Sequence, residues 1–263
     1  MNPEDIQRVK DLLPTSMGSE EIRATIAEQI LRRSIFSARM ESARYLARIR
    51  DVCAEISAGA INAAQARERL LNVLSQIGLD TSDTDVSLVN HASERRLNLI
   101  IDTQRQMAAS VARIEAETDD TFDAFPAWEL TRFGSPAFPR ADWVQRWTAA
   151  GDSVGWDGAL RSPWAGTGVG ISFLALKGSP IWEALGAGAG GYRDTLGNPY
   201  PPFAYGSWMD WKDVDRETAE RVGLIQPGAR AEKPPSPSLD PDDAELLEAA
   251  RRVGWPGAFD DIR

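Results

Sequence analysis

The stretch SERRLNLIIDTQRQMAASVARIEAETDD (residues 93–120) contains a long amphipathic helix and the point at which the composition of the chain changes. Its apolar side chains recur every three or four residues, as they do along one face of a helix. We expect this helix to begin at Ser87 or Ser93 and to end at Glu117. The stripe along it consists of Leu97, Ile100, Ile101, Gln104, Ala108, Val111 and Ile114.

A helical segment with two apolar faces lies nearer the N-terminus. Ser19, followed by two glutamates, is typical of a helix start, and apolar positions continue until Gly59 ends the run. Ile22, Ile26 and Ile30 share one face, whereas the apolar residues from Tyr45 onward lie on nearly the opposite face. The segment is therefore either one helix that packs on both sides or two helices with a break between residues 37 and 42.

A shorter helix separates these two segments. Asn62 is a typical N-cap, one apolar stripe follows it, and Gly78 is a typical C-terminal stop. Amphipathic helices joined by short loops favour an antiparallel bundle, which we expect over residues 1–118.

The composition changes near residue 119. All nine tryptophans, most of the prolines and most of the glycines follow this position. We therefore predict an α+β protein in which a bundle of long helices (1–118) precedes a small, loop-rich, Trp-rich α+β domain (119–225). A linker (226–240) and a C-terminal helix and tail (241–263) complete the expected domain organisation. The expected elements after the bundle are strands at 127–133 and 170–177 and helices at 179–186, 215–223 and 241–253.

Charge and composition exclude several classes of protein. The formal net charge of −10 disfavours a protein whose main task is to coat DNA or an anionic membrane, although it leaves a local DNA contact open. The longest apolar stretch, residues 171–176, is too short to cross a bilayer, and the acidic N-terminus is unlike a signal peptide. One cysteine and one histidine leave no disulfide framework and no Cys-rich or multi-His metal site.

Candidate catalytic groups are few. His91 lies beside a polar loop, as a capping or surface residue does, and Cys53 falls at helical spacing between apolar residues, as a buried thiol does. The segment GAGAGGY (186–192) lacks the Lys-Ser/Thr ending of a phosphate-binding loop. We assign no catalytic, cofactor-binding or metal-binding residue. The tryptophans of the second half could instead pack a core or stack on sugars or bases.

The segment LGNPYPPFA (196–204) has the composition of a rigid structural motif. Asn198 is pushed toward extended geometry by Pro199, and the two prolines that follow Tyr200 stiffen the chain before Phe203. We expect the aromatic residues of this motif to pack rather than to bind a ligand, together with Trp182 of the helix before it. The motif residues are Trp182, Asn198, Pro199, Tyr200, Pro201, Pro202 and Phe203.

A longer run around this motif resembles a known family. DTLGNPYPPFAYGSWMDWKDVDRETAERVGLI (194–225), preceded by LALKGSPIWEALG and FPAWELTRF, resembles the C-terminal region of the minor head proteins of tailed bacteriophages. These are also called head-morphogenesis proteins and include relatives of protein F of phage Mu. The helical segments IFSARMESARYLARIRDV and RLNLIIDTQRQMAASVA look like the helical part of the same proteins, so the likeness covers about residues 30–225.

The resemblance implies a virion component of low copy number near the portal vertex, without assigned catalytic residues. We expect a non-enzymatic assembly protein, located in the host cytoplasm during assembly and then in the virion. Its expected partners are portal or capsid subunits, with Ile22, Ile26 and Ile30 as the partner-binding stripe, and no membrane. The alternative is a carbohydrate- or nucleotide-acting enzyme that uses carboxylates and tryptophans of the second half.

Overall fold

The computed structural model describes residues 1–26, 28–133, 140–155, 173–231 and 233–234. Helices dominate, and two small sheets accompany them, which confirms the predicted α+β class. The chain packs as two compact units, and the division between them falls between Ala112 and Arg113, inside helix α6 (Glu94–Ala116). The change in composition at residue 119 comes slightly later, because the last turn of α6 already attaches to the second unit through Arg113.

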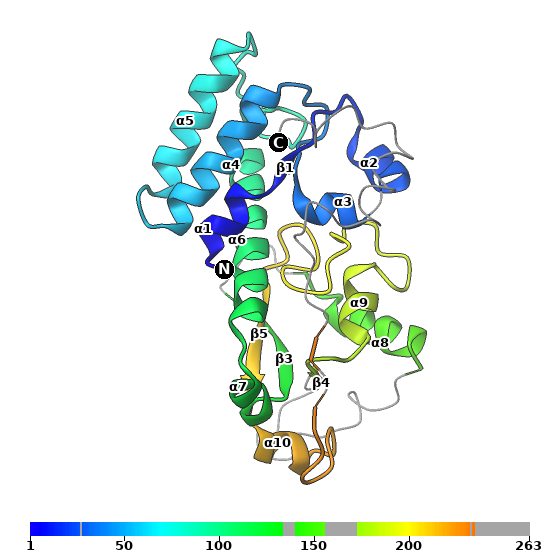
Figure 1. Cartoon of the computed structure of the whole chain (residues 1–263). Helices are drawn as coiled ribbons and strands as arrows, with labels where there is room; N and C mark the ends of the chain where they lie inside the picture. The colour runs from blue at the N-terminus through cyan, green and yellow to red at the C-terminus, as the bar shows by residue number, and fades with distance from the viewer. Residues whose placement is uncertain (27, 134–139, 156–172, 232, 235–263) are drawn as a thin grey trace. The chain divides into compact units, whose positions relative to one another are not determined.

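The first unit is mainly helical (Figure 1). Helix α4 packs against both α1 and α5, and the short strands β1 and β2 pair in parallel, with Asp11 opposite Ser34 and Leu12 opposite Ile35. The elements before α6 are α1 (Pro3–Arg8), β1 (Asp11–Leu12), α2 (Ser19–Thr25), α3 (Glu28–Arg33), β2 (Ser34–Ile35), α4 (Ala43–Ser57) and α5 (Ala63–Gln76).

The helices that the apolar pattern delimits most clearly form where it predicts. Asn62 caps α5 in a capping box, in which its side chain and that of Gln65 each accept a hydrogen bond from the other residue's backbone N–H. Gly78 follows with a φ of +83°, a left-handed conformation that suits glycine at a helix end. Helix α6 starts directly after Ser93, the later of the two predicted start points. Its buried Leu97 and Ile101 join α4 and α5 in one aliphatic core.

The segment between residues 19 and 57 differs from the expected one or two helices. It forms three helices, and the first starts after Gly18 rather than after a capping Ser19. Helix α2 ends because Ile26 adopts extended geometry, with φ −98° and ψ 127°. After α3 the chain enters β2, where pairing with β1 replaces helical hydrogen bonds, and it becomes helical again only at Ala43. The break at residues 37–42 is therefore present, and a second break precedes it.

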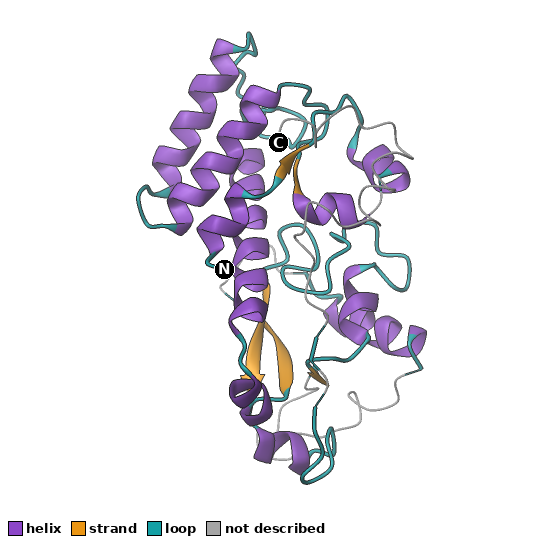
Figure 2. Ribbon diagram, in the orientation of Figure 1, coloured by secondary structure: helices purple, strands orange, loops and turns teal. Residues whose placement is uncertain are grey.

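The second unit is built on a three-stranded antiparallel sheet surrounded by short helices and long loops (Figure 2). The strand order is β4-β3-β5, with Trp128 opposite Asp213 and Leu130 opposite Trp211. The elements are α7 (Asp119–Ala124), β3 (Ala127–Arg132), α8 (Trp143–Ser153), β4 (Leu174–Leu176), α9 (Ile181–Gly186), β5 (Met209–Val214) and α10 (Arg216–Arg221).

Several predictions for the second half need correction or lie outside the structure. Strand β5 was not expected, and the predicted strand at 170–177 is observed only as β4. Helix α9 begins at Ile181 with Pro180 at the N-cap, so Ser179 lies one position further out than predicted. Residues 170–172, the predicted helix at 241–253, the rest of the tail to residue 263, and residues 232 and 235–240 of the predicted linker lie outside the described residues.

The core of the second unit is largely aromatic. Trp128 of β3 stacks on Trp211 of β5, with ring centroids 3.6 Å apart and planes 9° apart. Trp182 of α9 meets both rings edge-on, at centroid distances of 6.0 and 5.8 Å. Phe203 and Trp147 also contact Trp182, and all five side chains are buried. Such offset and edge-to-face arrangements let few but large side chains fill the space beside a small sheet.

Candidate functional site

The proline motif is part of the interior of the second unit. Asn198, Tyr200 and Phe203 are almost fully buried, as are Pro201 and Pro202, while Pro199 is half-buried. The end of α9 lies directly against the motif, because the N–H of Gly197 donates to the Gly186 carbonyl at 3.0 Å. A Cβ added at Gly186 would lie 1.7 Å from the carbonyl oxygen of Asn198. Glycine is therefore the one residue at position 186 that lets α9 and the motif approach this closely.

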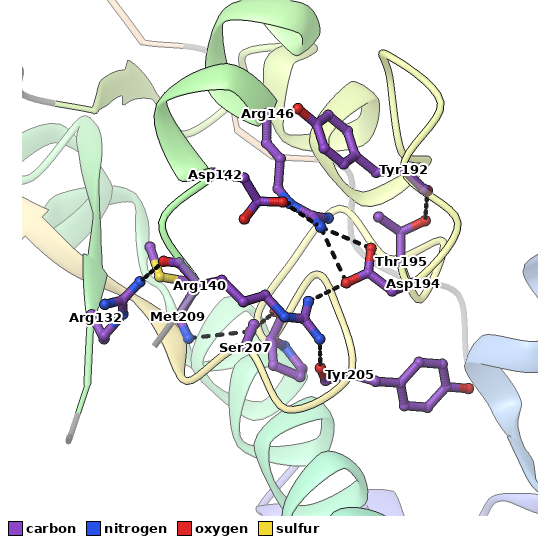
Figure 3. Close-up of polar contacts among 11 residues, drawn as sticks. Arg132, Arg140, Asp142, Arg146, Tyr192, Asp194, Thr195, Tyr205, Ser207 and Met209 are labelled. Atoms are coloured by element: carbon purple, nitrogen blue, oxygen red, sulfur yellow. Dashed lines mark hydrogen bonds and ion pairs between the residues drawn. The ribbon is translucent and has the colours of Figure 1, made fainter. Parts of the chain in front are cut away.

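An arginine–aspartate network holds the loop around this motif to helix α8. Figure 3 shows the guanidinium groups of Arg140 and Arg146 converging on the carboxylate of Asp194. Arg146 also pairs with Asp142, the N-cap residue of α8, at 2.9 Å. Arg140 donates a further hydrogen bond to the backbone carbonyl of Tyr205. Two arginines thus attach both ends of the loop 194–205 to the segment 140–146.

The charges in this network balance and bind mainly one another. Burial lowers the pKa of Arg146, but hydrogen bonds from its guanidinium to Asp142 and Asp194 outweigh that effect and hold the pKa above its ordinary value. The guanidinium carbon also lies 4.1 Å from the ring centroid of Tyr192, within the range of a cation–π contact. The planar fork of Arg146 therefore positions the loop, and it is charge-compensated by the two aspartates.

Lys177 forms a second polar centre next to the aromatic core. Its side chain is only 1% exposed, and its Nζ makes ion pairs with Glu117 and, at 3.1 Å, with Asp213. Asp213 also accepts a hydrogen bond from Trp128 Nε1 at 3.1 Å and pairs with Arg113 at 2.7 Å. Burial raises the pKa of Asp213, but the hydrogen bond and charge of Arg113 and the charge of Lys177 outweigh it, so the pKa lies below its ordinary value. This centre joins the end of α6 to β5.

A cavity of about 240 Å³ lies beside Lys177. Its lining combines one aromatic ring, several prolines and a few polar groups, as is common for small-molecule sites. The lining residues are Ile114, Lys177, Gly178, Ser179, Pro180, Trp182, Glu183, Pro199 and Pro234. Because the ammonium of Lys177 is already held by two carboxylates, its charge is compensated before any ligand enters the cavity.

Cys53 and His91 lie in environments that do not activate them. Cys53 is fully buried in the aliphatic core of the first unit, and burial raises the pKa of its thiol to about 12. Burial, with smaller contributions from Arg96 and Arg39, lowers the pKa of His91 to about 4. Over the residues that the structure describes, no three His, Cys, Asp or Glu side chains are grouped so that they could hold a metal ion.

The predicted partner-binding stripe is wrong. Ile22, Ile26 and Ile30 are all buried, and they form a small apolar cluster with Leu13 and Leu31. Helical spacing correctly put Ile22 and Ile26 on one side of their segment, but it gave no information on what covers that side. The residues that cover it come from the chain before α2 and from α3 itself, so these isoleucines belong to the core.

The structure brings together charged residues that sequence reasoning did not connect. Asp142 and Arg146 are four apart on α8, which is a local signal for an ion pair. Asp194 and Lys177 gave no such signal, because their partners are distant in the sequence. Glu117, at the predicted end of the long helix, is a partner of the buried Lys177.

Comparisons with known proteins identified no relative of this chain. No family model, no curated protein and no solved structure matches the chain. In the part of the chain that the structure describes, no helix has both the length and the apolar character needed to cross a membrane.

Proposed function

We propose that this chain is a non-enzymatic structural component of a tailed-bacteriophage head, a minor head protein that attaches near the portal vertex and takes part in head assembly. The observation that carries the proposal is the role of residues 194–225, the run that resembles this family. This run supplies Phe203 and Trp211 to the aromatic core and Asp194 to the arginine network. A segment used in this way acts as the framework of the second unit.

The distribution of the polar groups supports a structural role. Arg140, Arg146 and Lys177 each bind carboxylates of the same unit, so their charges stabilise the fold. The thiol of Cys53 and the imidazole of His91 have pKa values moved away from those that suit a nucleophile or a general base at neutral pH. The partners we propose are portal or capsid subunits of the same phage, met in the host cytoplasm and retained in the virion.

The proposal is tested by deleting the gene from the phage that encodes it and supplying the protein from a plasmid. We expect that the deletion abolishes infectious particles, that the plasmid restores them, and that purified particles contain the chain. As a matched pair, Gly186→Ala should fail to complement, because its Cβ would clash with the carbonyl of Asn198, whereas Gly191→Ala adds a Cβ with no atom of a non-adjacent residue within 4 Å and should complement to a larger extent despite its positive φ. Infectious particles without the protein would contradict the proposal.

The cavity beside Lys177 favours one second candidate, a carbohydrate- or nucleotide-binding activity. Trp182 and Glu183 contribute an indole and a carboxylate to its lining, and aromatic rings beside a few polar groups are common in small-molecule sites. Titration of the full chain with a panel of mono- and oligosaccharides and nucleotides tests this candidate. Saturable binding that Glu183→Gln weakens would support it, and the absence of binding at millimolar ligand would reject it.

A further inference from the structure

The connection between α5 and α6 exposes an unusual number of apolar side chains. Val86 is 75% exposed, Val89 is 67% exposed and Leu88 is 40% exposed. All three lie within four consecutive positions of the loop that leaves the C-terminal end of α5 (Figure 1). A chain in water normally turns such side chains inward, so a cluster of them at the surface indicates a contact site.

Hydrogen bonds within the loop define its shape. The carboxylate of Asp80 accepts from the N–H of Ser82, and that of Asp85 accepts from the N–H of Ser87, both at 2.8 Å. The side-chain amide of Asn90 donates to the carbonyl of Asp85 at 2.8 Å. These local bonds replace the hydrogen bonds that a helix or sheet would otherwise provide.

Arg96 anchors the apolar part of the loop from below. This arginine is buried in the first turn of α6, and its guanidinium donates to the carbonyls of Leu88 at 2.8 Å and Val89 at 3.1 Å. The other nitrogen of the guanidinium donates to Ser37 Oγ at 2.8 Å and to the Ala38 carbonyl at 2.6 Å. Arg96 therefore ties the backbone under the exposed side chains to the segment before α4. A loop held in this way loses little conformational entropy when it binds.

Acidic residues precede the apolar cluster along the loop. Asp80, Asp83 and Asp85 are exposed on the same loop. Hydrogen bonds from Ser82 and Ser87 lower the pKa of Asp80 and of Asp85, so both carboxylates are ionised at neutral pH. A complementary surface would offer an apolar depression for the valines and positive charge for the aspartates.

We propose that Val86, Leu88 and Val89 dock into an apolar pocket bordered by Lys and Arg side chains on another protein, and that this protein is the portal. The inference rests on the proposed function and specifies the surface that carries it out. A protein pocket fits this loop better than nucleic acid or an anionic membrane, because both of those would repel the three aspartates.

The test uses the full chain and the purified portal protein of the same phage in a titration by biolayer interferometry. Val86→Ser/Leu88→Ser/Val89→Ser should weaken binding at least about tenfold, as expected when apolar anchors are removed. The matched control is Val9→Ser/Val144→Ser, which changes exposed valines elsewhere in the chain and should alter binding less than about twofold. Asp83→Asn/Asp85→Asn should reduce the association rate and its dependence on salt.

The outcomes of the titration distinguish an error in the docking loop from an error in the proposed function. If the wild-type chain binds the portal and the triple variant binds equally well, the docking loop is wrong and the proposed function stands. If the wild-type chain does not bind the portal at all, the docking proposal is wrong, and the gene deletion described above decides the proposed function. If sedimentation detects dimers of the wild-type chain that the triple variant loses, the loop is a contact between copies, which also overturns the proposal. Val86→Ser alone, at the most exposed position, provides a second test if the triple variant fails to fold.

Discussion

The first unit fills its core with aliphatic side chains from regular helices, whereas the second fills much of its core with a few large rings from strands, a short helix and a loop. Leu70 and Leu97 stand for the first kind of core, and Trp128 and Trp211 for the second. In the first unit, each aliphatic side chain contributes a modest share of a large contact surface. In the second unit, each aromatic ring contributes a large share of a smaller contact surface. The irregular backbone of the second unit therefore depends on a small number of individual residues.

The largest effect is expected for Trp182→Ala. Trp182 contacts Trp128, Trp147, Trp211 and Phe203, and its Nε1 donates to the Leu176 carbonyl at 2.9 Å. Truncation should lower the free energy of unfolding of the second unit by about 3–5 kcal/mol. Urea titration followed by circular dichroism measures this loss. The control is Trp208→Ala, at a tryptophan 38% exposed, with an expected loss below about 1 kcal/mol. Equal losses at both positions would remove the contrast between the units.

A smaller loss is expected for Ile30→Ala in the first unit. Ile30 is fully buried, but its neighbours in the cluster are aliphatic and can shift toward the space that it leaves. The unfolding free energy should fall by about 2–4 kcal/mol, in the range for buried isoleucine. Differential scanning calorimetry provides the measurement, and exposed Val9→Ala serves as the control. A stable Ile30→Ala variant with impaired assembly would instead restore the partner-binding role of this stripe.

Acid should destabilise the first unit through His91. Its pKa is lowered to about 4 in the folded chain, whereas an unfolded chain titrates its histidine near about 6.5. The unfolded state therefore binds more protons between these values, and stability falls as the pH falls from about 6.5 to about 4. The slope from this group is at most about 1.4 kcal/mol per pH unit, and partial exposure reduces it. Unfolding curves recorded at several pH values give the free energy of unfolding as a function of pH. This dependence should be weaker for His91→Gln than for the wild-type chain, and an equal dependence would contradict the assignment to His91.

The smallest effect is expected for the cap of α5. Asn62→Ala removes the acceptor for the N–H of Gln65 and should cost about 1 kcal/mol. Asn62→Asp retains an acceptor at the same place and serves as the matched control. Hydrogen exchange of the amides in the first turn of α5 measures the local effect. Faster exchange in both variants would show that the cap depends on more than this acceptor.

Helices of the first unit could be predicted because their signals are local. Asn62 and Gly78 mark the ends of α5 within the sequence itself, and the apolar period of α6 is legible over its whole length. Strand β5 was not predicted because three of its six residues are charged, and its structure is set by pairing with β3. Residues such as Lys177 and Glu117 are sixty positions apart, so only the folded chain brings them together. The burial of Ile22 was equally hidden, since periodicity does not identify the residues that cover a face.

The stacked rings of Trp128 and Trp211 also give the second unit an optical signature. Two indoles at 3.6 Å with nearly parallel planes are close enough for their electronic transitions to couple. Where the two transition dipoles are skewed to one another, such coupling produces a paired positive and negative band in circular dichroism, which an isolated tryptophan lacks. Residues 1–112 contain no tryptophan, so they cannot contribute to this band. Its loss during unfolding would therefore mark the moment at which β3 and β5 separate, independently of the helical signal of the first unit.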